Sequence, residues 1–262
     1  MDLNFAWRMH ISKLSYFRML LATVVFACLL ISLIFPGNTQ DRSEITITAA
    51  NYPPFEIADP IDGLTGFDHE VVTEAFRRVG QPVRIVFLPW NRAIMEIKSG
   101  EAAAVLSCAH RAQREEFAFF SDQLSTSTDG IYYRRDHEAK KVKSVDELKD
   151  QRVAAVNGYS SFLKLRDLGM EPHSVPDDET GLKMLRLGRF DYFYNGKQAT
   201  DFLISQSGQT GLFKFISLSE KPLYLCLSKA YPGAGQLLDD FNKGLAAVKA
   251  DGTYALIHAK YK

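Results

Sequence analysis

The stretch of sequence that decides the fold spans residues 49–67 and reads AANYPPFEIADPIDGLTGF. The residues that lead into it, 45–49, alternate and predict a short strand, and a helical apolar period begins at Asp68. This places Tyr52 as an exposed ring in a loop at the carboxyl end of a strand. Open α/β sheets bind small molecules at that end of their strands. The stretch therefore predicts a ligand-binding protein.

Working outward, strand and helix patterns alternate along the chain twice. Such alternation predicts parallel sheets with right-handed crossovers, and its repetition without a linker predicts two α/β lobes. The first run has strands at 45–49, 83–88 and 102–107 with helices at 68–79 and 91–98; the second has strands at 152–156 and 190–194 with helices from about 162 and at 178–187. Outside these runs, the patterns predict extended segments at 117–121, 129–135 and 224–228, and helices that begin at Ser144, span 237–249 and begin at Gly252.

The composition is that of a soluble globular protein and excludes a nucleic-acid binder. Of the 262 residues, 46% are apolar and 24% are charged. Leaving out the first 40 residues, with three basic and one acidic side chain, the chain holds 28 Lys and Arg against 30 Asp and Glu. Without a basic surface there is nothing to hold a phosphate backbone.

The first 40 residues predict a targeting segment. Arg8, Lys13 and Arg18 precede residues 19–35, a run of 17 residues without a charge. A signal-peptide core usually has about 7–15 such residues and a membrane-spanning helix about 20. Residues 1–40 are therefore either a cleaved signal peptide or a membrane anchor. Both place the remainder outside the cytoplasmic membrane, in the periplasm.

Three cysteines are present, and one of them, Cys28, lies within the apolar run. In an oxidising compartment Cys108 and Cys226 could form a disulfide. The sequence does not show whether their Cα atoms lie within reach of each other. The interpretation we favour at this point is two unpaired, buried cysteines in strands.

Chemical motifs that would indicate an enzyme or a metal site are missing from the sequence. It contains no H-E-x-x-H, C-x-x-C, G-x-S-x-G, Walker or G-x-G-x-x-G motif. We therefore expect no catalytic residue, no metal site and no cofactor. The run Asp177-Asp178-Glu179 is typical of a solvated helix start, where acidic side chains are favourable.

Eight short motifs, in order and at the usual spacing over residues 44–262, carry a family resemblance. The chain resembles the bacterial extracellular solute-binding proteins of family 3, which are receptors of polar-amino-acid ABC importers, and its Pro-Trp-x-Arg-Ala motif is similar to that of one subgroup. The motifs are Tyr52-Pro-Pro-Phe-Glu, Gly66-Phe-Asp68, Pro89-Trp90-Asn-Arg92-Ala93, Ser99-Gly100-Glu, Arg114-x5-Phe120-Ser121-Asp122, Ser144-Val-Asp-Glu-Leu-Lys, Val156-Asn-Gly158 and Ala250-Asp-Gly-Thr-Tyr254.

The resemblance implies a periplasmic-binding-protein-like type II fold, in which two hinge strands join two α/β lobes around a ligand cleft. The expected crossovers lie near 122–128 and 221–225. The expected domains are residues 1–40 as targeting segment, 41–124 as the first part of lobe 1, 125–222 as lobe 2, and 223–262 as the return to lobe 1. A monomer is expected, and closure around the ligand would be a hinge motion.

The resemblance also implies ligand-binding positions on lobe 1. Arg114 matches the arginine that pairs with the ligand carboxylate, and its planar fork of donors suits this task; Arg111 is a nearby rival. Tyr52 and Trp90 match two aromatic positions that enclose the ligand side chain. Ser107, at the end of the third strand, matches a position where backbone and hydroxyl contact the ligand.

On lobe 2, Tyr159 and Ser160 match the loop that closes over the carboxylate, although Ser160 would also suit plain helix capping. The chain departs from the family pattern at Gly196, where amino-acid receptors usually have an Asp that holds the ligand ammonium group. The neighbouring Asn195 is expected to supply a neutral hydrogen bond instead. A standard α-amino acid ligand is therefore in question.

These observations predict a protein that captures a small, carboxylate-bearing, amino-acid-like solute and hands it to an ABC permease in the inner membrane. One alternative is a membrane-anchored module that senses a ligand. A less favoured alternative is an enzyme similar to the periplasmic dehydratases of the same fold, for which Glu56 and Asp68 are the acids on the cleft side that the sequence offers.

Overall fold

The computed structural model describes residues 42–138 and 142–261, and the contacts reported below lie within the unit that begins at Ser43. The predictions for residues 1–40, with the apolar run 19–35 and Cys28, fall outside the described residues. Within the described ranges, no helix combines the length and the apolar character needed to span a membrane.

In the described residues, one mixed sheet of nine strands runs through the molecule in the order β2-β1-β3-β9-β5-β8-β6-β7, and β4 pairs with β9 outside this order. The strands are β1 (Ile45–Ala49), β2 (Val83–Phe87), β3 (Ala104–Ala109), β4 (Ala118–Phe120), β5 (Ser125–Arg134), β6 (Val153–Val156), β7 (His173–Val175), β8 (Tyr192–Gly196) and β9 (Phe213–Ser228).

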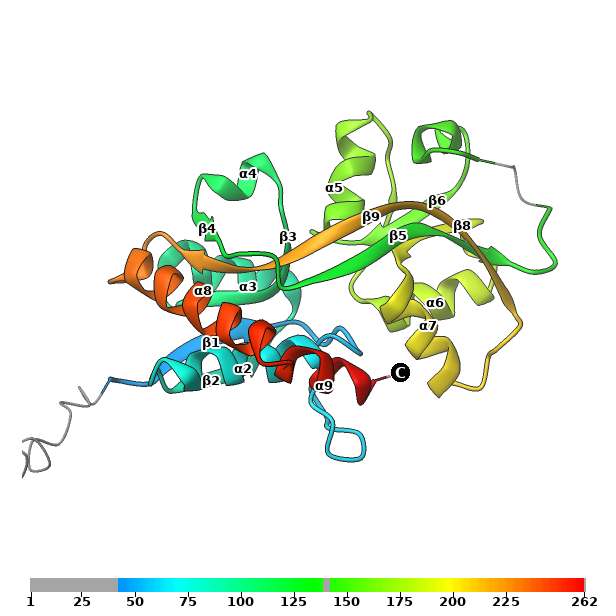
Figure 1. The fold of residues 1–262 in the computed structure, drawn as a ribbon. Helices are drawn as coiled ribbons and strands as arrows, with labels where there is room; N and C mark the ends of the chain where they lie inside the picture. Colours follow the sequence, from blue (N-terminus) through cyan, green and yellow to red (C-terminus); the bar gives the residue numbers. More distant parts are fainter. Residues whose placement is uncertain (1–41, 139–141, 262) are drawn as a thin grey trace, which may run out of the picture. The chain divides into compact units, whose positions relative to one another are not determined.

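Two long antiparallel strands, β5 and β9, connect the two halves of the sheet, and Figure 1 shows them side by side. Their ladder begins with Ser125 opposite Leu223 and ends with Arg134 opposite Phe213. On one side β1 pairs in parallel with β2 and β3, and on the other β6 pairs in parallel with β7 and β8. This arrangement confirms the predicted two-lobed α/β fold. The lobe boundaries at residues 124 and 222 stay a prediction, which the start of the ladder supports.

Helices follow the apolar patterns that predicted them. Along α2, the residues Val71, Val72, Ala75 and Phe76 are fully buried, while Arg77 and Arg78 in the last turn favour the helix dipole. The helices are α2 (Phe67–Arg78), α3 (Trp90–Ser99), α4 (Ala112–Glu115), α5 (Ser160–Asp167), α6 (Asp178–Arg186), α7 (Lys197–Gln206), α8 (Ala234–Ala250) and α9 (Thr253–Ala259), with a 3-10 helix at Val145–Leu148.

Each half of the sheet has its own apolar core. In the half built on β1 and β3, Phe76 packs against Phe241 of α8, with ring centroids 5.1 Å apart. In the half built on β6 and β8, Phe190 packs against Phe193, with centroids 6.2 Å apart. Separate cores on the two sides of the β5–β9 ladder are what a two-lobed protein requires.

The predicted elements are present, with ends displaced by a few residues. The sequence patterns missed β7, α4, α7 and the first half of β9. Two of these are short, at three and four residues. Helix α7 begins directly after β8 without a turn sequence to separate them, and β9 is only partly buried where it was missed, so its apolar signal is weak there.

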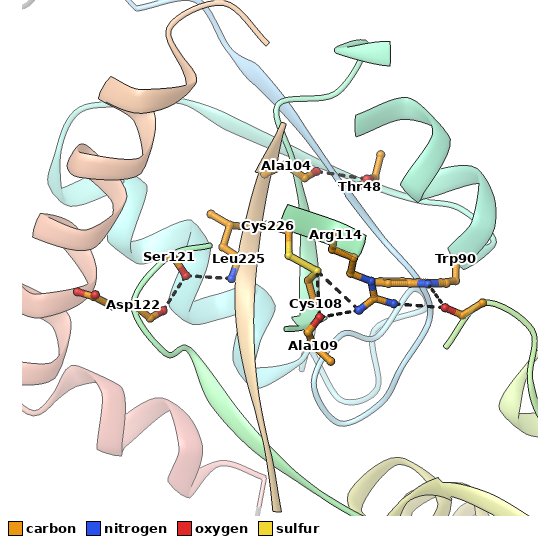
Figure 2. The surroundings of a disulfide bond; sticks show 11 residues. Thr48, Trp90, Ala104, Cys108, Ala109, Arg114, Ser121, Asp122, Leu225 and Cys226 are labelled. Atoms are coloured by element: carbon orange, nitrogen blue, oxygen red, sulfur yellow. Dashed lines mark hydrogen bonds between the residues drawn. A yellow bond between two sulfur atoms is a disulfide. The ribbon is translucent and has the colours of Figure 1, made fainter. Parts of the chain in front are cut away.

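The expectation of two unpaired cysteines is wrong, because Cys108 of β3 and Cys226 of β9 form a disulfide (Figure 2). Their Cα atoms lie 5.8 Å apart, within the range that a disulfide bridges. Both residues are buried in strands as expected. The antiparallel pairing of β3 with β9 brings them together, and the sequence could not show this pairing because 118 residues separate the two positions.

Candidate functional site

A pocket lies where the loop after β1, the end of β3 and the turn after β6 meet the β9 crossover. This location is the carboxyl end of parallel strands, as predicted from the loop that carries Tyr52. Residues from both lobes line the pocket: Ala50, Tyr52, Glu56, Trp90, Leu106, Ser107, Ala109, Arg114, Tyr159, Ser160, Lys221 and Leu223.

Six of the seven predicted ligand-binding residues line this pocket, and their roles toward a ligand stay predictions. The six are Tyr52, Trp90, Ser107, Arg114, Tyr159 and Ser160. The seventh, Asn195, does not line it. One feature differs from expectation, because Tyr52 is a buried ring with 8% exposure and not an exposed one. It is covered by Phe55, whose ring stacks on it at 5.1 Å, and by Tyr159.

Arg114 is a buried cation, only 5% exposed, on the short helix α4. Its Nη1 donates to the Ala109 carbonyl at 2.7 Å and its Nη2 to the Gly158 carbonyl at 3.3 Å, and its guanidinium lies 5.0 Å from the Trp90 ring centroid (Figure 2). Burial lowers the pKa of Arg114 to about 10. Within the described residues, no carboxylate pairs with it. An anion entering the pocket would meet an unpaired guanidinium.

The other basic groups near the pocket already have partners. Arg111, the rival of Arg114, forms an ion pair with Asp167 and donates to the Ser160 carbonyl at 3.3 Å. Lys221 of β9 forms an ion pair with Asp129 at 2.6 Å. These pairs make Arg114 the stronger candidate for binding a ligand carboxylate.

Three aromatic rings meet across the two lobes. The Tyr159 ring packs edge-on against Tyr52 at 5.8 Å and against Trp90 at 5.9 Å. The Trp90 indole nitrogen donates to the Gly158 carbonyl at 3.0 Å, which is also the carbonyl that Arg114 contacts. Residues of lobe 1 and of the turn before α5 are therefore held together around the pocket.

A buried pair of acids, Glu56 and Asp68, meets at Ser107, whose φ of 50° lies in the left-handed region. The Ser107 hydroxyl contacts Glu56 Oε1 and lies 2.7 Å from Asp68 Oδ2. One hydroxyl hydrogen cannot serve two carboxylates, so one acid must carry a proton and donate it. Consistent with this, burial raises the pKa of Asp68 to about 7, and burial together with Asp68 raises the pKa of Glu56 well above its usual range.

Asn195 lies behind the pocket wall and binds Asp178. Its Nδ2 donates to Asp178 Oδ1 at 2.5 Å and to Thr200 Oγ1 at 3.0 Å, which uses both amide hydrogens.

Asp178 is 4% exposed, so the prediction of a solvated helix start at residues 177–179 is wrong for this residue. Asp177 does fill the capping role, since its Oδ1 accepts from the Thr180 amide at 2.7 Å.

Gly196 faces the phenol of Tyr52. A Cβ atom at this position would lie 2.1 Å from Tyr52 Oη and 2.8 Å from Ser127 Oγ. A side chain here would force the Tyr52 and Ser127 side chains to move, so the constraint on this position is space and not backbone conformation, since its φ of −74° is one that any residue adopts. The tyrosine hydroxyl occupies the place into which a side chain at position 196 would extend.

Glu56 and Lys221 also line the pocket, although neither was predicted to be a ligand-binding residue. Glu56 carried a signal, because it follows Tyr52-Pro-Pro-Phe in the same loop. Lys221 carried only one signal, its place in the predicted crossover segment. Asp178 carried no such signal, because an acid at a helix start is usually exposed.

The chain matches a family of known proteins over nearly its whole described length. The model of the bacterial extracellular solute-binding proteins, family 3, matches residues 45–262. The L-cystine-binding protein TcyA of Bacillus subtilis (strain 168) is 29% identical over 229 residues, which cover 86% of this chain and 83% of that protein. The histidine-binding periplasmic protein of Escherichia coli (strain K12) is 24% identical over 252 residues, covering 92% and 91%.

Solved structures show the same fold. A histidine kinase sensor domain with similarity to periplasmic binding proteins matches with a TM-score of 0.75 at 21% identity, covering 84% of this chain and 96% of that one. Two α/β lobes, two connecting strands and a pocket between the lobes define the class of periplasmic-type solute-binding proteins.

Within that class, the chain belongs to the bacterial extracellular solute-binding proteins, family 3. The prediction of a solute-binding protein of this family is confirmed.

Proposed function

We propose that this protein captures a small amino-acid-like solute outside the cytoplasmic membrane, holds the carboxylate of that solute on Arg114, and hands it to an ABC permease in the inner membrane. It acts as a monomer and binds its ligand without converting it. The observation that carries the proposal is the buried guanidinium of Arg114, which has no carboxylate partner within the described residues and faces the pocket.

The buried charge of Arg114 makes binding of an anion favourable. A buried cation is expensive unless an anion pairs with it. Two carbonyl groups satisfy part of the Arg114 hydrogen-bonding capacity but carry no net charge. A ligand carboxylate would supply both the charge and the planar acceptor geometry that a guanidinium matches.

The relatives support the solute class. The two named above are binding proteins for L-cystine and for histidine, and both ligands carry α-carboxylates. The contacts of Trp90 and Arg114 with the Gly158 carbonyl join the two lobes beside the pocket. Ligand binding would stabilise this closed arrangement, which is the form that a permease partner would recognise.

The test is a thermal-shift screen of the purified chain against the 20 amino acids, L-cystine, dicarboxylates and short peptides, followed by calorimetry on the hits. A ligand at about 100 times its Kd adds about 2.7 kcal/mol of stability, or roughly 5–10 °C in Tm. We expect Arg114→Ala to weaken binding by about 30-fold or more, because a charge left unpaired in a closed site costs about 2–5 kcal/mol.

Arg92→Ala is the matched control, since Arg92 is an exposed arginine on α3 and forms an ion pair with Glu96. It should leave the affinity unchanged. If Arg114→Ala bound the ligand as tightly as the wild type while Arg111→Ala did not, the carboxylate site would lie at Arg111. Chemical change of the ligand during incubation, followed by NMR, would contradict a pure binding function.

A further inference from the structure

We infer that Asp178 determines which ligands the pocket prefers, because it polarises the ring of Tyr159 so that this ring favours a ligand ammonium group. The inference rests on the proposed function and deepens it, since it adds recognition of an ammonium group to recognition of a carboxylate by Arg114. Asp178 acts through the Tyr159 ring and does not contact the ligand itself.

Asp178 is a buried anion without a cation. It is 4% exposed, and its two oxygens accept from neutral groups, the Tyr159 phenol at 2.9 Å and the Asn195 amide at 2.5 Å. Within the described residues, no lysine, arginine or histidine forms an ion pair with its carboxylate. A buried carboxylate held only by neutral donors keeps a strong preference for a nearby positive charge.

Tyr159 connects this carboxylate to the pocket. Its ring lines the pocket and packs edge-on against Tyr52. A phenol that donates to a carboxylate becomes polarised, which makes its ring more negative, and the face of such a ring attracts cations. In the described chain, no lysine or arginine stacks on Tyr159 or Tyr52, whereas Arg114 lies over Trp90. Because Phe55 and Tyr159 cover the Tyr52 ring, the Tyr159 ring is the one left for a cation from the ligand.

The pocket as a whole has the charge pattern of a zwitterion. Arg114 is a buried cation that lacks an anion, and Asp178 is a buried anion that lacks a cation. A ligand that carries both a carboxylate and an ammonium group would offset both unpaired charges.

The experiment compares two ligands that differ in one group. The first probe is the amino acid, among the 20 standard ones and L-cystine, that the full chain binds most tightly, and the second is the matching 2-hydroxy acid, in which a hydroxyl replaces the ammonium group. We expect the wild type to prefer the amino acid by about tenfold or more, and Asp178→Asn to reduce this preference by about tenfold.

Two further variants separate the effect of the Asp178 charge from a structural effect of the Asp178→Asn substitution. Asp177→Asn removes the same charge from the neighbouring exposed position and retains a good helix cap, so the preference should not change. Tyr159→Phe keeps the ring and removes its bond to Asp178, and we expect it to reduce the preference about threefold. If Asp178→Asn did not fold, the ligand preference of Tyr159→Phe would show whether Asp178 acts through the Tyr159 ring.

Three outcomes would overturn the inference. Asp178→Asn could weaken both ligands equally, which would show a purely structural role. The preference could survive in full in Tyr159→Phe. The wild type could bind the hydroxy acid as well as the amino acid, in which case the carboxylate function at Arg114 would stand without the ammonium preference. Binding of neither ligand would contradict the proposed function itself.

Discussion

At the scale of single residues, the pocket depends on one close approach between its two lobes. Gly196 at the end of β8 has no side chain, and the Tyr52 phenol from the other lobe fills the space where one would be. The family resemblance put a standard α-amino acid ligand in question, because the usual carboxylate at position 196 is missing. The structure shows that a tyrosine hydroxyl occupies the space and that an acid, Asp178, lies behind the neighbouring Asn195.

This close approach predicts the effect of adding one carbon atom. Gly196→Ala would place a methyl group 2.1 Å from Tyr52 Oη, and overpacking of this kind costs about 1–3 kcal/mol. We expect urea denaturation to show this loss, and Tyr52→Phe in the same chain to recover part of it, because the nearest atom is then removed. Gly235→Ala in α8 is the control, since a Cβ there meets nothing within 4 Å. Equal costs at both glycines would contradict the packing argument.

At the scale of elements, the disulfide joins strands β3 and β9 beside Arg114 (Figure 2). Residue 109, directly after Cys108, provides the carbonyl that Nη1 of Arg114 contacts. The strand ladder itself also positions this carbonyl, because Ala109 lies opposite Leu223. We therefore assign the disulfide mainly a stabilising role and the ladder the positioning role.

Replacing both cysteines tests whether the disulfide stabilises the fold without being needed to position the Ala109 carbonyl. The disulfide encloses 118 residues, and a crosslink over a loop of that length contributes about 4–5 kcal/mol in the chain-entropy account. We expect Cys108→Ser with Cys226→Ser to lower the free energy of unfolding by about this amount while ligand affinity changes less than about threefold. Reduction of the wild type should have the same effect, and reducing agent should not affect the double variant. A large loss of affinity at full folding would show that the disulfide also shapes the site.

At the scale of the whole molecule, buried acids near the pocket couple its stability to pH. Burial raises the pKa of Asp68 to about 7 and that of Asp178 to about 6, from an ordinary value of 3.8. The native state therefore binds more protons than the unfolded state between about pH 4 and 7. Stability contributed by these groups is present at low pH and is lost as pH rises through their native pKa values.

We accordingly expect the urea midpoint to be higher at pH 5 than at pH 8. Asp68→Asn should make this pH dependence shallower, because asparagine does not titrate, whereas Asp59→Asn, at an exposed position, should leave it unchanged. Below about pH 4 a different set of acids should destabilise the protein. Glu74 and Asp251, whose pKa values their arginine and threonine partners lower to about 2, are examples. A urea midpoint that rises from pH 5 to pH 8 equally in the wild type and in Asp68→Asn would contradict the conclusion that Asp68 contributes to the pH dependence of stability.

Local sequence signals predicted most of the elements and most of the site. The 2.0 and 3.6 residue periods depend only on neighbouring residues, so strand β1 and helix α2 were predictable. The loop after β1 placed Tyr52 at the pocket because the carboxyl ends of parallel strands meet at one edge of a sheet. Motif spacing likewise indicated Trp90, Ser107 and Arg114, all of which line the pocket.

The tertiary structure alone decided what depends on residues that are distant in sequence. Pairing of Cys108 with Cys226 follows from the β3–β9 ladder. Burial of Asp178 follows from packing of α6 against β8, and its contact with Tyr159 joins residues on two elements. The sequence by itself determined the class of protein and the edge of the sheet that binds a ligand. Which charges are buried without partners at that edge was decided by packing, because burial and pairing are properties of three-dimensional neighbours.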